Sequence, residues 1–372
     1  MRYVEFKEKF KERMDNLLDD FITSKGETDV DLSTEIMRVT KSGDPYDGLI
    51  IKGLSGSPVI RLDVCRQFFE YHMTVGDDPV EKQLDRTVEI AFEKDYKPFL
   101  NNALRKIKSG DKRNLFDNIF PEFNFNDVND YNKMLEQNRL FVKVSNAGKN
   151  GEVLANAPHK ALSDELVMTY HIYIGTNANE VNRGVASAIV NNDLFSKWKD
   201  DFGLTFEQLD RDALTSAKKR FPLKVDAIEN FLSSIAMEMA TEGHSITPSP
   251  SNQTMYVVTG KMSGNFVPAG AASLFYPGAF EEISEIIDQD GFYCIPSSVH
   301  EFLVLGEDAV KTSGLNIKDL TEMIKDVNAE CVSPSDYLSD TLYHYDGKTK
   351  TFEKSEEYEA RTKDKEKTGE KL

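Results

Sequence analysis

The first hundred residues alternate between helical and strand-like patterns of apolar positions. Between Phe6 and Phe21, apolar residues recur three and four apart with Lys and Glu between them, which predicts an amphipathic helix. Asp78 and Pro79 predict the start of a second helix, because Asp accepts hydrogen bonds from free amides and Pro fits the first turn. Between the two helices, three short runs have strand character: residues 35–40, 48–53 and 58–62. The pattern predicts a small α+β unit over residues 1–110.

The rest of the chain predicts a larger mixed unit. Strand patterns occur at residues 140–144, 167–174, 255–259, 292–295, 302–305 and 340–345. Helical patterns occur at residues 205–221, 226–239 and 277–287, and after Asn316. Thr205 and Gln208 have the spacing of a capping box at the start of the first of these helices. Together they predict an α+β fold of helices and mainly antiparallel sheets, with the second unit over residues 139–353. An Asn-, Asp- and Phe-rich stretch at 111–138 is expected to be a linker, and the charged residues 354–372 are expected to form a disordered tail or a frayed helix.

Composition excludes several classes of protein. The chain has 372 residues, 40% of them hydrophobic and 10% aromatic, which is too much apolar surface for a chain disordered over most of its length. The sequence contains no apolar run long enough to cross a membrane, and its first residues lack the apolar core of a secretory signal. Three widely spaced cysteines, at positions 65, 294 and 331, fit free thiols in a reducing cytoplasm.

Acidic residues are concentrated in one block of the chain. Residues 281–340 contain 14 Asp or Glu and only three Lys, so this block alone has a charge of −11 out of a net −18. The ordinary interpretation is a solvated acidic face, and the alternative is a docking surface for a basic partner or a mimic of nucleic acid. The net charge argues against nonspecific binding to nucleic acid or to anionic lipid.

Common signatures of cofactor and metal sites are missing from the sequence. It contains neither Gly-x-Gly-x-x-Gly nor the Gly-x-x-x-x-Gly-Lys phosphate loop, and no Cys-x-x-Cys. The six His residues never occur in pairs at the spacing of common zinc motifs. We therefore expect no cofactor and no metal ion.

One local group of residues has the composition of a nucleophilic site. Cys294, Ser297 and Ser298 are candidate nucleophiles, His300 is a candidate general base, and Glu301 could orient the imidazole. The competing interpretation is structural, since a Cys within an apolar strand is a small buried hydrophobe and Ser residues are ordinary turn formers. Under that interpretation the segment is a tight connection between neighbouring strands, with Cys294 facing the core, pairing weakened at Pro296, and a turn through the two serines.

Five segments of the chain resemble a bacterial family of unknown function, number 5688 in the domain-of-unknown-function series. They are Pro158-His-Lys-Ala-Leu162, Met255-Tyr-Val-Val-Thr259, Gly270-Ala-Ala-Ser-Leu-Phe-Tyr-Pro-Gly278, Phe292-Tyr-Cys-Ile-Pro-Ser-Ser-Val-His-Glu301 and Leu338-Ser-Asp-Thr-Leu-Tyr-His-Tyr-Asp346. The order of the N-terminal helix and strands also matches that family, so the resemblance covers most of residues 1–353. It implies a cytoplasmic bacterial protein, and it implies no activity and no catalytic or ligand-binding residue.

The sequence therefore favours a soluble, non-catalytic binding or accessory protein of the bacterial cytoplasm, with another protein as the expected partner. The first alternative is a hydrolase or transferase that uses Cys294, Ser297 or Ser298 with His300. The second is an acidic antagonist or regulator that docks a basic protein. Convergent side chains in a cleft near His300 would favour the enzyme, whereas a flat apolar patch would favour the binding protein.

Overall fold

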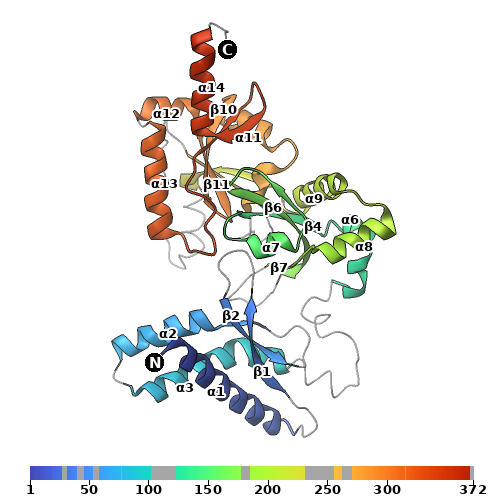
Figure 1. Ribbon diagram of the computed structural model, residues 1–372, viewed down its shortest axis with the longest axis vertical. Coiled ribbons are helices and arrows are strands. Elements are labelled where there is room, and N and C mark those ends of the chain that lie inside the picture. Colours follow the sequence, from blue (N-terminus) through green and yellow to red (C-terminus); the bar gives the residue numbers. More distant parts are fainter. Residues whose placement is uncertain are drawn as a thin grey trace. The chain divides into compact units, whose positions relative to one another are not determined.

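The computed structural model shows a mixed α+β protein of two compact units, Met1–Phe125 and Asn126–Leu372 (Figure 1). It describes residues 1–26, 32–39, 46–52, 58–76, 78–101, 123–176, 185–230, 255–261, 270–314 and 316–368. All strand pairs in these ranges are antiparallel, as the sequence predicts. Within the same ranges, no helix combines the length and the apolarity that crossing a bilayer requires.

Unit 1 packs helices against a small sheet. Its helices are α1 (Tyr3–Ser24), α2 (Leu62–Val75) and α3 (Val80–Ala91), and its strands, in sheet order, are β1 (Ser33–Val39), β2 (Tyr46–Lys52) and β3 (Ile60–Arg61). The predicted stripe of α1 forms the centre of the core, where Phe6, Phe10 and Met14 are fully buried. A π-helical turn, η1 (Phe92–Tyr96), continues α3, and the Tyr96 hydroxyl donates to the Leu49 carbonyl of β2 at 2.6 Å.

Unit 2 begins with a four-stranded sheet. Its strands are β4 (Leu140–Asn146), β5 (His159–Ala161), β6 (Leu166–Thr176) and β7 (Val185–Ile189), with β6 paired to each of the other three. Its helices are α6 (Tyr131–Glu136), α7 (Gly151–Ala155), α8 (Asn192–Phe202) and α9 (Phe206–Arg220). The capping box predicted for α9 is confirmed, since the Thr205 hydroxyl accepts from the Gln208 amide and the Gln208 side chain accepts from the Thr205 amide. The only tryptophan of the chain, Trp198, is fully buried on α8.

A six-stranded sheet completes unit 2. In sheet order its strands are β13 (Thr351–Lys354), β12 (Tyr343–Asp346), β10 (Gly291–Ser298), β11 (Glu301–Gly306), β9 (Tyr256–Gly260) and β8 (Leu223–Ala227). The accompanying helices are η3 (Gly270–Phe275), α11 (Ala279–Ile287), α12 (Glu307–Ser313), α13 (Ile317–Cys331) and α14 (Ser355–Thr368). Alternate residues of β10 serve opposite faces: Phe292 contacts Phe280 of α11, whereas Tyr293 and Ile295 pack with α12 and α13.

Three predicted segments differ from the structure. The predicted linker 111–138 contains the helical segments η2 (Phe125–Asn129) and α6, and its residues 111–122 lie outside the described ranges. Of the helix predicted at 226–239, the first two residues end strand β8, and residues 231–239 lie outside the described ranges. The strand predicted at 58–62 is only two residues long, because α2 begins at Leu62 and buries Leu62 and Phe69 on one helical face.

Of the two forms expected for the residues from 354 on, disorder is wrong for residues 355–368, which form the helix α14. This helix is held by polar contacts that a hydrophobic pattern does not report. The Arg361 guanidinium bonds Asp346 and Glu353, and the Tyr358 ring stacks on His344 with 3.5 Å between centroids. Residues 369–372 lie outside the described ranges.

Candidate functional site

The segment that the sequence singled out is a β-hairpin. Strands β10 and β11 pair with a register shift between Ile295 and Ser298, which confirms the weakened pairing expected around Pro296. The turn lies at Val299 and His300, one residue beyond the two serines that we expected to form it. Cys294 faces the core as predicted and has no exposed surface. Burial raises the pKa of its thiol well above the ordinary value, so the group stays protonated at neutral pH.

The two serines of this hairpin are bonded to Glu301. The hydroxyls of Ser297 and Ser298 both donate to Glu301 Oε1, at 3.0 and 2.9 Å, and the His300 amide donates to Ser298 Oγ at 3.0 Å. The His300 imidazole lies 3.6 Å from Asp336 Oδ1, with a quarter of its side chain exposed. In this geometry the Glu301 carboxylate accepts the hydrogen bonds of both serine hydroxyls, and it stabilises the end of the hairpin.

A cavity of about 580 Å³ lies elsewhere in unit 2, where the two sheets meet beside α13. One wall is the end of β4 with the following turn and Glu165, and the second is one face of α13. The third is the segment that leads into β12, and the fourth is the junction of β13 with α14. The lining residues on these walls are Asn146, Gly148, Lys149, Glu165, Ile317, Thr321, Lys325, Tyr337, Asp340, Thr341, Leu342, Lys354, Ser355 and Glu356.

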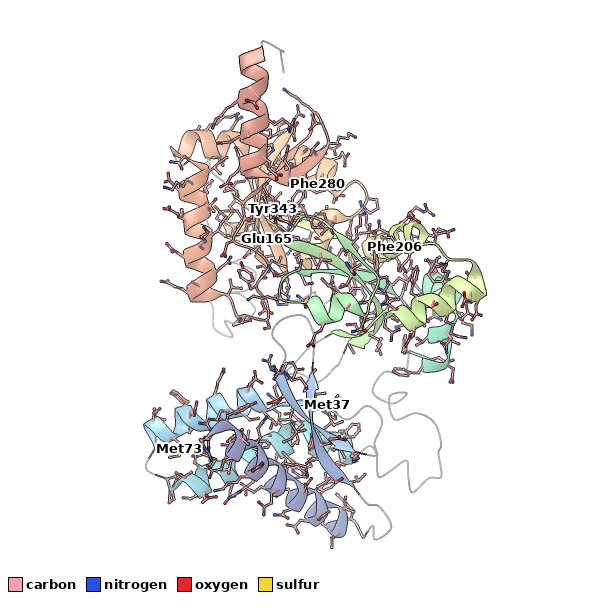
Figure 2. All side chains as sticks on the ribbon, in the orientation of Figure 1. Met37, Met73, Glu165, Phe206, Phe280 and Tyr343 are labelled. Carbon is pink, nitrogen blue, oxygen red and sulfur yellow. The ribbon has the colours of Figure 1, made fainter. Side chains whose placement is uncertain are left out.

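Directional hydrogen bonds join the two sheets at this cavity. Glu165, just before β6, accepts from the hydroxyls of Ser339 and Thr341, which lead into β12. The Asn146 amide of β4 donates to the Leu338 carbonyl at 2.7 Å. Figure 2 labels Glu165 and, from β12, Tyr343, whose hydroxyl lies 2.9 Å from that of Ser163. The cavity therefore has a frame that is formed without a ligand.

The lining carries three lysines with different surroundings. Lys354 Nζ lies 2.6 Å from Asp164, and this hydrogen bond raises the pKa of the ammonium. Lys149 Nζ lies 4.2 Å from the centre of the Tyr337 ring. Within the described part of the chain, Lys325 has no carboxylate within 4 Å. Three carboxylates balance these charges on the lining: Glu165, Asp340 and Glu356.

Ser355 combines full burial with an unsatisfied hydroxyl. It is the first residue of α14, lines the cavity, and has no exposed surface. Its amide donates to the Leu342 carbonyl at 3.0 Å, whereas its hydroxyl has no hydrogen-bond partner among the described residues. A buried polar atom without a partner costs about 1–3 kcal/mol, so such atoms are rare unless something else satisfies them.

A second cluster, which is partly buried, fixes the position of α14. Glu307 Oε1 accepts from His344 Nε2 at 2.9 Å and from the Tyr358 hydroxyl of α14 at 3.0 Å. The hydrogen bond to His344 is the largest cause that lowers the pKa of Glu307 to about 2. The cluster therefore contains a carboxylate that stays ionised at neutral pH, and it holds the helix that supplies one wall of the cavity.

Sequence reasoning missed the cavity because its walls come from distant segments. Each segment alone is ordinary: a strand end, a helix face, a loop and a helix start. The one local signal is Lys325, which is among only three lysines in the acidic block. Among the described residues, no group of three His, Cys, Asp or Glu side chains is placed to hold a metal ion.

Comparison with known proteins gives one match. A family model described as a family of unknown function (DUF5688) matches residues 3–347. Neither a curated protein nor a solved structure matches the chain. The matched residues include three walls of the cavity, and the junction of β13 with α14 lies beyond them.

Proposed function

The chain belongs to the DUF5688 family of unknown function, and we propose that it is a non-catalytic binding protein whose second unit holds a small polar ligand in the cavity beside α13. We place it in the bacterial cytoplasm, as an accessory protein that responds to this ligand. The three free cysteines, one of them exposed at Cys331, suit a reducing compartment.

The observation that carries the proposal is the cavity with its unsatisfied Ser355 hydroxyl. Its volume of about 580 Å³ lies within the usual range of small-molecule sites, about 300–1,000 Å³. Charged and hydroxyl groups converge on it from both sheets and two helices, and they sit on a hydrogen-bonded frame. A preformed polar site binds without the cost of ordering its own side chains.

The protonation states of the lining favour binding over acid–base chemistry at neutral pH. Burial and the nearby charges of Asp340 and Glu165 raise the pKa of Tyr337 to about 12, so the phenol stays neutral. The raised pKa of Lys354 keeps that amine protonated. Neither group has a pKa near 7, where a general acid or base works best.

Filling the cavity tests the proposal. A library of small polar metabolites would be screened for compounds that raise the unfolding midpoint of the protein, followed by circular dichroism because the two variants add a second tryptophan to Trp198. The screen compares the wild type with Thr321→Trp, which fills the α13 wall, and with Glu322→Trp, the adjacent residue outside the lining. We expect hits that stabilise the wild type and Glu322→Trp and have no effect on Thr321→Trp. A library without any hit, or hits that stabilise Thr321→Trp equally, would refute the proposal.

A further inference from the structure

We infer that the ligand of this cavity carries one oxyanion group, bound at the N-terminal turn of α14 with the Ser355 hydroxyl and the Lys325 ammonium as its partners. The inference rests on the proposed function and specifies the chemistry of its ligand.

The start of α14 offers donors and a favourable field. The helix is 14 residues long, so the partial positive charge of its N-terminus is fully developed. The first amides of a helix have no acceptor within the helix, and here the Ser355 amide is already bonded to Leu342. The amides of Glu356 and Glu357 are the next in the turn. Such a turn binds anions through its amide groups.

The Ser355 hydroxyl is independent support for a ligand at this place. It is fully buried at the lining of the cavity and lacks a partner among the described residues. A hydroxyl can donate its hydrogen to a ligand oxygen, and a charged acceptor makes that bond stronger than a neutral one. An oxyanion would therefore satisfy the buried atom that the protein leaves without a partner.

Lys325 differs from the other lysines of the acidic block. Lys311 lies 3.1 Å from Glu307, and Lys318 lies 3.9 Å from Glu322, each on its own helix. Lys325, on the cavity wall, has no carboxylate within 4 Å among the described residues. In a chain of net charge −18, a lysine without a counter-ion at a cavity wall attracts an anion.

The carboxylates of the lining limit the charge of the ligand. Glu165, Asp340 and Glu356 also line the cavity, so a ligand with a second oxyanion group would be repelled. The same carboxylates can accept hydrogen bonds from hydroxyl or ammonium groups at the other end of a small molecule. The fitting class is a metabolite with one carboxylate or one phosphate group and hydrogen-bond donors elsewhere.

Anion titrations of the full chain test the inference. Sodium phosphate and sodium acetate serve as the two probes, with sodium chloride at matched ionic strength as the blank, and Trp198 fluorescence reports the unfolding midpoint of unit 2. We expect one of the two probes to raise the midpoint saturably and chloride to give no saturable change. A response to phosphate assigns a phosphorylated metabolite, and a response to acetate assigns a carboxylate one.

Three variants locate the anion. Ser355→Ala and Lys325→Gln should each weaken the binding by about tenfold, because each removes a bond to a charged group. Lys318 lies on α13 like Lys325 but outside the lining of the cavity, so Lys318→Gln should leave anion binding unchanged. Ser355→Ala should also raise the midpoint without anion, because it removes an unsatisfied buried hydroxyl, so weaker binding is separated from misfolding.

Any of four results would overturn the inference. The first is equal stabilisation by chloride, and the second is unchanged anion binding in both Ser355→Ala and Lys325→Gln. If neither probe binds while neutral or cationic compounds stabilise the protein in a way that Thr321→Trp abolishes, the oxyanion assignment fails and the proposed function stands. If no compound binds in the cavity at all, both fail.

Discussion

Replacing Glu307 by Gln should make the stability of unit 2 less dependent on pH. The carboxylate accepts from His344 and from Tyr358 of α14 through Oε1, and Lys311 donates to Oε2 at 3.1 Å. Glutamine keeps the size of the side chain and can still accept at one oxygen, so the variant removes the charge and little else. The change therefore tests how much the ionised carboxylate contributes to holding α14 in place.

The expected magnitude follows from the pKa of the carboxyl group. In the folded protein it is lowered from 4.5 to about 2, which corresponds to about 3 kcal/mol at roughly 1.4 kcal/mol per pKa unit. The side chain is 24% exposed, so screening by water reduces the figure to about 2 kcal/mol. Because the pKa is lower in the folded state, this stability is present above pH 4.5 and is lost as the pH falls towards 2.

Urea unfolding followed by Trp198 fluorescence measures the effect in the unit that contains Glu307. At pH 7 Glu307→Gln should be less stable than the wild type by about 2 kcal/mol, and the two curves should converge between pH 5 and pH 2. Glu322→Gln is the matched control, since Glu322 is 65% exposed and lies 3.9 Å from its lysine. The reasoning is refuted if the difference at pH 7 is absent, or if it persists unchanged at pH 2.

Three further experiments, one with a thiol probe and two with substitutions, test other parts of the structure. A thiol probe should label the exposed Cys331 rapidly and Cys294 only after unfolding, and rapid labelling of Cys294 in the folded protein would restore the nucleophile hypothesis. Thr205→Ala should destabilise unit 2 by about 1 kcal/mol in urea, because it removes the capping box of α9; no change would mean that the cap contributes nothing. Gly48→Ala should lower the melting temperature of unit 1, measured by circular dichroism, because its Cβ would overlap the Val59 side chain, whereas an unchanged melt would contradict that packing.

Local sequence signals predicted the elements whose causes are local. The capping box of α9 was predicted because Thr205 and Gln208 are three residues apart, and the start of α13 was predicted because Asn316 precedes an apolar helical pattern. The strands β4, β6, β10 and β11 were readable from their apolar runs. The ordered packing of helix α14 was missed because its contacts, such as Tyr358 on His344, join segments that no local sequence pattern relates.

The candidate site also has one part that local sequence signals predict and one part that they do not. The hairpin of β10 and β11 was predicted together with the burial of Cys294, because alternation along a strand is a local pattern. The cavity could not be predicted, because Asn146 and Lys325 are brought together only when the two sheets pack. The unsatisfied hydroxyl of Ser355 is likewise a property of the folded molecule, since burial decides whether a serine lacks a partner.

The segments that form the cavity walls follow one another along the chain, and their order determines when the cavity is completed during protein synthesis. The four-stranded sheet lies within residues 140–189 and the six-stranded sheet within 223–354, so each sheet can fold from a contiguous stretch as it leaves the ribosome. The wall at Ser355 and Glu356 follows every strand of both sheets. A nascent chain whose α14 has not yet left the ribosome therefore carries both sheets and only three walls of the cavity, so the cavity that we propose as a binding site is completed last.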